Sequence, residues 1–455
     1  MQREAEKKSC AELLKQCRIE RDLEREHIEQ LEKLLNHDPD TGLLQRHILM
    51  RRLSKLLEGG CETLAYGILR LDQNYQRIRH IRDRMKVLLY VTTERLKPIV
   101  GEENLYQSDR SDEFLFILEN VKSRAEVEKR INDMIIKVAE PHNPPASDLT
   151  FGCNVGVALY PEHARNLDEL VINAEIALGI YEEKSWHGFI YSPEIGEAHY
   201  ANQSLEYNLR KCILNNFEGF HVAYQPIVNS KKEIVACEAL MRWDAPGIGA
   251  VSPEKFIGLA EKSGLINYVG KWILYKALAQ VKRWRTERKA DMQVSVNLSP
   301  VQLEQKDLVD MIFTAMDVLK VPGEAIHLEL TERAVMLNPE DISTKLKMLQ
   351  SRGIEIMLDD FGTGYSSLSA LNNFPINTLK IAKEFVDNLP DDKEALEMIR
   401  VIMSITRTFK FTTLAEGIED DSQFDLLVKE GCQFIQGYIT SPPVAAVEFE
   451  ERFLK

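Results

Sequence analysis

Short apolar runs separated by amphipathic stretches recur along most of the chain. In the second half, helical patterns separate most of the apolar runs, which occupy residues 234–236, 293–296, 326–328, 354–358, 378–381, 412–414 and 432–435. Repeated strand-then-helix units over about 250 residues are typical of a (β/α)8 barrel. We therefore predict a TIM-like barrel, whose chemistry would lie at the carboxyl ends of its strands.

The first half has a different rhythm of apolar and polar positions. Strand-like runs at 64–71 and 149–160 and a hairpin over 105–118 alternate with helical patterns at 80–99, 125–138 and 166–181. This order predicts an α/β sandwich. The chain is thus predicted to contain an N-terminal signalling or coiled-coil helix (1–36), an α/β domain (37–195), a connecting helix (196–217) and the barrel (218–455).

Composition and charge narrow the class of protein. Apolar residues make up 44% and charged residues 28%, as in globular proteins, and no apolar run reaches the length of a membrane span. Seven cysteines without a pairing pattern predict reduced thiols in a cytoplasmic protein. A net charge of −14 argues against binding a nucleic-acid polymer. Metal ions and a few arginines could still hold a small phosphate ligand.

The candidate chemistry is a set of polar residues at the predicted strand ends. Asp359 and Asp360 directly follow an apolar strand, and two adjacent carboxylates favour a cation between them. Taken singly, such residues have ordinary explanations, such as an ion pair for Glu238 or Lys380 and a helix cap for Asn297. As a set, the oxygen ligands favour Mg²⁺ or Mn²⁺: Glu238, Asn297, Glu329, Asp359, Asp360 and Glu416.

The second half resembles the EAL domain, the family of cyclic di-GMP phosphodiesterases. The matching runs follow the family's order over about residues 205–455: YQPIV (224–228), CEALMRW (237–243), LAEKSGLI (259–266), VSVNLSP (294–300), LELTER (328–333), LDDFGTGYSSL (358–368), LKI (379–381), AEGIE (415–419) and QGY (436–438). The resemblance implies hydrolysis of cyclic di-GMP to linear pGpG with two divalent ions.

The resemblance also implies a role for each matching residue. It assigns Glu416 as a second-metal ligand or general base, Lys380 as the group that orients the attacking water, and Glu332 as support for the loop over 359–365. Arg242 suits a phosphate because its guanidinium offers a fixed fork of donors. The metal ligands would be Glu238, Asn297, Glu329, Asp359 and Asp360, and the residues near the dinucleotide would be Gln225, Arg242 and Gln436.

One position departs from the EAL pattern. The family usually reads LKID, whereas this chain has Ala382 at the fourth position. Loss of a carboxylate that supports the metals and water would slow the reaction by roughly 10–100-fold. Slow catalysis is the expectation, and restoring aspartate at position 382 should speed it.

The first half resembles the GGDEF domain of diguanylate cyclases, through HDPDTGLLQR (37–46), NVGVALYP (154–161) and the helix around 173–179. Its signature is degenerate, because RSDEF (110–114) replaces GGDEF and bulky side chains crowd a turn that needs glycine. Arg70 replaces the first metal aspartate while Asp72 is kept, Gln45 replaces an asparagine, and no arginine lies in 100–109 to form the inhibitory product site. We expect a regulatory or dimerising module without cyclase activity.

Two functions remain open on this sequence. The first is a cyclic di-GMP phosphodiesterase regulated by an inactive GGDEF domain, acting as a homodimer because related domains commonly dimerise. The second is a receptor that binds cyclic di-GMP without efficient hydrolysis and signals to a protein partner through the N-terminal helix. Ala382 favours the receptor, and the intact DDFGTG loop with Glu332, Lys380 and Glu416 favours the enzyme.

Overall fold

The chain divides into two compact units, Met1–Ala201 and Asn202–Lys455. The computed structural model describes residues 21, 35–72, 82–141, 151–179, 186–335, 338–362 and 374–454. Apart from residues 21, 35 and 36, the predicted N-terminal helix lies outside the described residues. The predicted boundaries of the N-terminal helix, the α/β domain, the connecting helix and the barrel therefore stay predictions.

The amino-terminal unit is built on a six-stranded sheet with the order β1-β3-β4-β2-β5-β6. Strands β2 and β5 are buried on both faces, because apolar residues occupy successive positions along them. The predicted hairpin over 105–118 is confirmed as β3 and β4. The strands are β1 (Leu44–Gln45), β2 (Leu64–Leu71), β3 (Leu105–Gln107), β4 (Glu113–Glu119), β5 (Cys153–Tyr160) and β6 (Gly188–Ile190).

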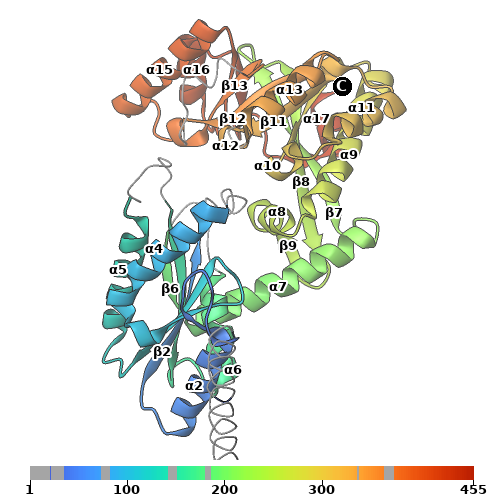
Figure 1. Ribbon diagram of the computed structural model, residues 1–455. Helices are drawn as coiled ribbons and strands as arrows, with labels where there is room; N and C mark the ends of the chain where they lie inside the picture. The colour runs from blue at the N-terminus through green and yellow to red at the C-terminus, as the bar shows by residue number, and fades with distance from the viewer. Residues whose placement is uncertain are drawn as a thin grey trace, which may run out of the picture. The chain divides into compact units, whose positions relative to one another are not determined.

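Two apolar cores lie on opposite faces of this sheet. Along β2, Ala65 and Leu69 belong to one core, whereas Tyr66 and Ile68 belong to the other, as the two-residue period of a strand requires. Helices α4 (Arg82–Val100) and α5 (Arg124–Ala139) cover the first face, and α2 (Arg46–Glu58) and α6 (Leu167–Leu178) cover the second (Figure 1). The predicted α/β sandwich is thus confirmed.

The carboxyl-terminal unit contains a closed eight-stranded barrel, which confirms the predicted fold class. Neighbouring strands pair in the order β7-β8-β10-β11-β12-β13-β14-β15, and β15 pairs again with β7. The strands are β7 (Phe220–Asn229), β8 (Ile234–Ala245), β9 (Gly249–Val251), β10 (Gln293–Asn297), β11 (Ile326–Thr331), β12 (Glu355–Phe361), β13 (Thr378–Ile381), β14 (Thr412–Ala415), β15 (Phe434–Gln436) and β16 (Val444–Ala445).

The barrel departs from regular strand-then-helix repetition at β7. This strand runs antiparallel to both of its barrel neighbours, and a short turn at residues 230–233 joins it to β8. The apolar pattern had assigned no strand here. Pro226 within the strand lacks an N–H group, a feature that usually argues against a central strand. The structure places Pro226 opposite Cys237 within the β7–β8 pairing.

Helices outside the barrel bury its apolar outer surface (Figure 1). The carboxyl-terminal helix α17 is joined to α9 by Glu450, which accepts hydrogen bonds from Trp284 Nε1 at 3.1 Å and Arg288 Nη2 at 3.0 Å. The helices are α8 (Pro253–Lys262), α9 (Ile266–Glu287), α10 (Pro300–Leu303), α11 (Leu308–Leu319), α12 (Glu332–Val335), α13 (Pro339–Gln350), α15 (Lys393–Phe409), α16 (Asp421–Glu430) and α17 (Ala446–Phe453).

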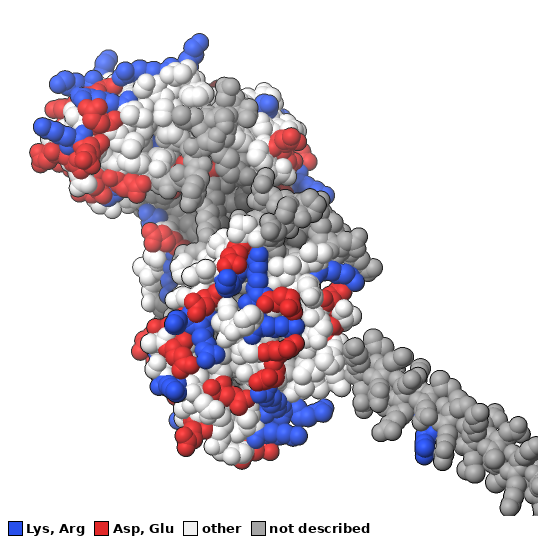
Figure 2. Space-filling model, turned by 60° about the vertical axis from the view of Figure 1, so that its left-hand side comes forward, with Lys and Arg blue, Asp and Glu red and all other residues white. Residues whose placement is uncertain are grey.

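The connecting helix predicted over 196–217 is present as α7, which has the same length but begins and ends three residues earlier, from Pro193 to Leu214. Among the described residues, none of the helices combines the length and apolar character that a membrane crossing needs. On the described part of the face drawn in Figure 2, basic and acidic side chains are interspersed. Mixed charge of this kind does not create the basic field that attracts nucleic-acid polymers.

Candidate active site

A cavity of about 390 Å³ lies at the carboxyl ends of the barrel strands. Small-molecule sites usually have volumes of about 300–1,000 Å³, and barrel enzymes carry their chemistry at this end. Most of the residues that the sequence nominated line the cavity. They are Gln225, Glu238, Asn297, Asp359, Lys380, Glu416 and Gln436.

Lys380 on β13 is the centre of the polar cluster and is only 1% exposed. Its Nζ lies 2.5 Å from Glu416 Oε1, 3.4 Å from Asp359 Oδ1 and 4.0 Å from Glu238 Oε2. It also donates a hydrogen bond to Glu329 Oε2 on β11. Four carboxylates therefore converge on one ammonium group, and with all five groups ionised the cluster carries three net negative charges.

Burial and mutual repulsion shift the titration of this cluster. Burial, with the nearby Glu238 carboxylate, raises the pKa of Glu329 well above its ordinary value. Burial also raises the pKa of Glu416 to about 7. For Lys380, burial would lower the pKa, but the surrounding carboxylates raise it above its ordinary value. The excess negative charge thus favours bound protons, which further cations would displace.

Amide side chains fix the orientation of Glu238. Asn297 Nδ2 donates to Glu238 Oε1 at 2.7 Å, and Gln436 Nε2 donates to Glu238 Oε2 at 2.7 Å. Gln436 Nε2 also lies 3.1 Å from Gln225 Oε1, and Gln225 Nε2 donates to the Ser441 carbonyl oxygen at 3.2 Å. The hydrogen bond to Glu238 uses the amino group of Asn297 and not its amide oxygen, which is an acceptor and could bind a cation.

The donor set fits divalent cations. Carboxylate oxygens of Glu238, Glu329 and Glu416 lie within 4.8 Å of one another. Among the described residues, no hydrogen-bond donor reaches the buried Glu329 Oε1. A buried oxygen without a donor is costly, and a bound cation would remove that cost. With Asp359 and the Asn297 oxygen nearby, the cluster offers the all-oxygen ligands that Mg²⁺ and Mn²⁺ prefer.

Strand β12 is irregular where it carries the paired aspartates. Its register with β13 shifts between Leu358 and Phe361, and Asp360 has a left-handed backbone with a φ of 55°. Aspartate tolerates this conformation, and such irregularities can redirect side chains next to active sites. Asp359 lines the cavity, whereas Asp360 is exposed and outside the cavity-lining set. Residues 363–373 of the following loop lie outside the described residues.

Like Glu329 and Asp360, the positions Arg242, Glu332 and Ala382 are not among the residues that line the cavity. Arg242 lies on β8 four residues beyond Glu238, and its Nη1 donates to the Met241 carbonyl oxygen at 2.8 Å. Glu332 is buried at the start of α12, and no donor within the described chain reaches its Oε2. Residues 363–365 of its predicted partner loop (359–365) lie outside the described residues. Ala382, directly after β13, is buried.

The cavity also has wall residues that the sequence analysis did not nominate. All of them lie one to three residues beyond a nominated residue along the chain, so extending each nominated position by three residues would have found them. They are Leu240, Lys383, Gly417, Glu419, Gly437 and Tyr438.

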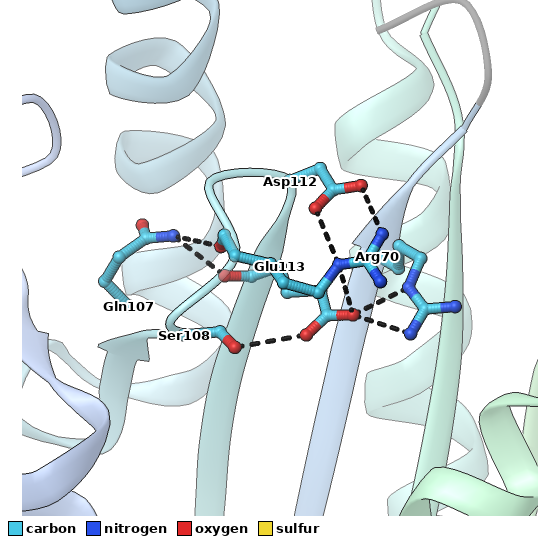
Figure 3. A network of polar contacts seen from close by, with 6 residues as sticks. Arg70, Gln107, Ser108, Asp112 and Glu113 are labelled. Carbon is cyan, nitrogen blue, oxygen red and sulfur yellow. Dashed lines mark hydrogen bonds and ion pairs between the residues drawn. The ribbon is translucent and has the colours of Figure 1, made fainter. Parts of the chain in front are cut away.

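The RSDEF turn of the amino-terminal unit neutralises its own carboxylates (Figure 3). Arg70 Nη2 lies 2.6 Å from Glu113 Oε1, and Ser108 Oγ donates to Glu113 Oε2 at 3.1 Å. Arg110 Nε lies 3.2 Å from both Asp112 Oδ1 and Glu113 Oε1. The two signature acids therefore already have cationic partners within the chain. By the resemblance to GGDEF domains, Arg70 replaces a metal-binding aspartate. In the structure the guanidinium of Arg70 binds Glu113.

Asp72 is also engaged within the amino-terminal unit. Its Oδ2 accepts hydrogen bonds from the Gly152 backbone N–H at 3.0 Å and from Trp186 Nε1 at 3.1 Å. A Cβ atom at Gly152 would lie 1.7 Å from Trp186 Nε1, so only glycine allows the indole to approach so closely. Asp72 thus joins the end of β2 to two other segments of its own unit.

Comparison with known families agrees with these two sites. The family model described as the EAL domain matches residues 208–443, and the model described as "Diguanylate cyclase, GGDEF domain" matches residues 35–186. The chain is a tandem GGDEF–EAL protein. Its barrel is the EAL domain, and its α/β unit is a GGDEF domain with the signature RSDEF. EAL domains generally depend on divalent metal ions, in agreement with the glutamate cluster.

Relatives of this GGDEF–EAL protein include named cyclic di-GMP enzymes. The bifunctional diguanylate cyclase/cyclic di-GMP phosphodiesterase MucR of Pseudomonas aeruginosa is 28% identical, covering 92% of this chain and 61% of MucR. The cyclic di-GMP phosphodiesterase PdeR of Escherichia coli is 28% identical, covering 95% of this chain and 66% of PdeR. The solved PaMucR phosphodiesterase in complex with c-di-GMP is 33% identical, with a TM-score of 0.52, covering 54% of this chain and 99% of that one. The chain spans about half to two thirds of the length of the curated relatives it matches.

Proposed function

We propose that the EAL domain hydrolyses cyclic di-GMP to linear pGpG at a site with two divalent metal ions. The observation that carries this proposal is the convergence of four carboxylates on Lys380, which lines the cavity together with three of them. The names of the relatives MucR and PdeR, and the c-di-GMP complex of the PaMucR phosphodiesterase, support cyclic di-GMP as the substrate.

Charge explains why this site needs metal ions. With its carboxylates ionised, the cluster would repel a phosphodiester, since both are negative. Two bound divalent cations would reverse the net charge, activate a water molecule and stabilise the oxygens around the phosphorus. The proposed ligands are Glu238, Asn297, Glu329, Asp359 and Asp360.

The remaining residues of the site hold and move protons or position other groups. Lys380 would orient the attacking water, because its ammonium donors lie among the carboxylates. Glu416 would serve as a ligand or as the general base. Gln436 holds Glu238, Gln225 accepts a hydrogen bond from Gln436, and both would line the cavity beside a bound dinucleotide. Arg242 as a phosphate contact and Glu332 as loop support remain parts of this proposal.

We also propose that the GGDEF domain makes no cyclic di-GMP and regulates the EAL domain. The ion pairs of Arg70 and Arg110 with the signature acids support this role, because they occupy carboxylates that a Mg²⁺–nucleotide complex would need. A cytoplasmic homodimer, and a protein partner that binds the N-terminal helix, complete the proposal.

A cyclic di-GMP receptor is the second candidate function, and Ala382 is the observation that favours it. Position 382 follows β13 directly, two residues after Lys380, where the family usually carries an aspartate. A site without this carboxylate could bind the dinucleotide and hydrolyse it slowly or not at all. The signal would then pass to a protein partner.

One experiment separates the two functions. The purified full chain is incubated with cyclic di-GMP and Mn²⁺, with a matched sample in EDTA, and the nucleotides are separated by chromatography. We expect pGpG only in the Mn²⁺ sample. Binding of cyclic di-GMP by calorimetry without any pGpG would favour the receptor and reject the enzyme.

A further inference from the structure

Lys383 is a cation at the cavity whose role the proposed reaction leaves open. Within the described cavity wall, Lys380 and Lys383 are the cationic side chains. Lys380 is buried among four carboxylates, so its charge is already used. The Lys383 side chain, in contrast, is 49% exposed. It can therefore reach a ligand that enters from solvent.

The ammonium group of Lys383 is held in place from one side. Its Nζ lies 2.6 Å from Glu419 Oε1 and 2.9 Å from Asp387 Oδ1. An ammonium group has three donors, so two carboxylates leave one donor for a ligand. Both carboxylates are about half exposed, and exposed ion pairs contribute only about 0–1 kcal/mol. They position the lysine without competing strongly against a phosphate.

The stem of Lys383 is fixed by the backbone beside the cluster. Gly417 has a φ of +73°, and a Cβ atom added there would lie 2.4 Å from Lys383 Cγ. The lysine stem therefore packs against the residue that directly follows Glu416. Because stem and ammonium are both located before a ligand arrives, little ordering is needed on binding.

The chemistry of a cyclic dinucleotide supplies a ligand for this ammonium. Such a ring has two phosphodiesters, each with one negative charge, on opposite sides of the ring. Only one can lie at the carboxylate cluster, and a separate cation at the cavity wall would stabilise the other. We infer that Lys383 binds the phosphodiester that is not cleaved, an inference that rests on the proposed function.

The test compares substrates with two phosphodiesters and with one. Lys383→Met and Lys383→Arg are assayed on cyclic di-GMP and on bis(p-nitrophenyl) phosphate, which has a single phosphodiester. For Lys383→Met we expect KM for cyclic di-GMP to rise about tenfold, the scale of one charge-assisted hydrogen bond, with kcat unchanged. Hydrolysis of the single phosphodiester should not change, and Lys383→Arg should recover most of the affinity.

Lys232→Met is the matched control. Lys232 is also about half exposed and paired with a carboxylate, Asp421, but it lies outside the cavity-lining set. Equal losses on both substrates, or no loss on either, would overturn the inference. If the wild-type chain hydrolyses neither substrate, the proposed reaction fails, and the affinity of each variant for fluorescent cyclic di-GMP still tests Lys383. Unchanged affinity in Lys383→Met would then reject it.

Discussion

Replacing Lys380 by methionine tests whether protein and metal cations share the carboxylate cluster. The change keeps an apolar stem of similar length and removes the ammonium that four carboxylates face. Without metal, Glu329 and Glu416 would lose their nearest described cation. With metal bound, the added positive charge would offset most of that loss.

The expected magnitude follows from the burial of Lys380, which is 1% exposed. Removing one partner of a buried ion pair costs about 3–5 kcal/mol. For a domain of this size, about 1 kcal/mol lowers Tm by roughly 2–4 °C, so Lys380→Met should lower the Tm of the EAL domain by about 6–20 °C in EDTA. In saturating Mn²⁺ we expect less than half of that decrease, because metal binding stabilises the folded state.

The measurement is thermal unfolding of the full chain at pH 8 in EDTA and in Mn²⁺. Lys345→Met is the matched control, because Lys345 is also buried and pairs with Asp341 at 2.7 Å. It donates to the Leu303 carbonyl oxygen at 2.7 Å and does not line the cavity. The decrease in Tm caused by Lys345→Met should be the same in EDTA and in Mn²⁺. If Lys380→Met behaves like this control, the idea of a shared cation site is wrong.

Three further predictions concern other parts of the chain. Ala382→Asp should raise kcat for cyclic di-GMP by about 10–100-fold, measured as pGpG formation, and an unchanged rate would show that this carboxylate is not needed. Glu450→Ala should lower the free energy of unfolding in urea by about 1–3 kcal/mol, since it removes the acceptor for Trp284 and Arg288, and a normal midpoint would contradict this. The full chain given GTP and Mg²⁺ should form no cyclic di-GMP, and any product on chromatography would refute the role given to Arg70.

Periodicity alone was sufficient to predict the barrel and much of its site. Apolar runs indicated seven of its strands, and the polar residues at their carboxyl ends included Asn297, Asp359, Lys380 and Glu416. These side chains meet because parallel strands in register bring their carboxyl ends to one rim. The pattern of apolar and polar positions can predict this meeting of side chains, because the prediction requires only the direction of each strand and the face on which each side chain lies.

The tertiary structure decided which groups touch. The apolar pattern did not indicate β7, which contains Pro226 and closes the barrel in the antiparallel direction. Gln436 bonds Gln225, which is 211 positions away along the chain, and together they orient Glu238. Partners this distant depend on strand order and barrel closure, and local sequence carries no information about either. The packing of the Lys383 stem against Gly417 has the same origin, because it exists only once β13 and β14 lie side by side.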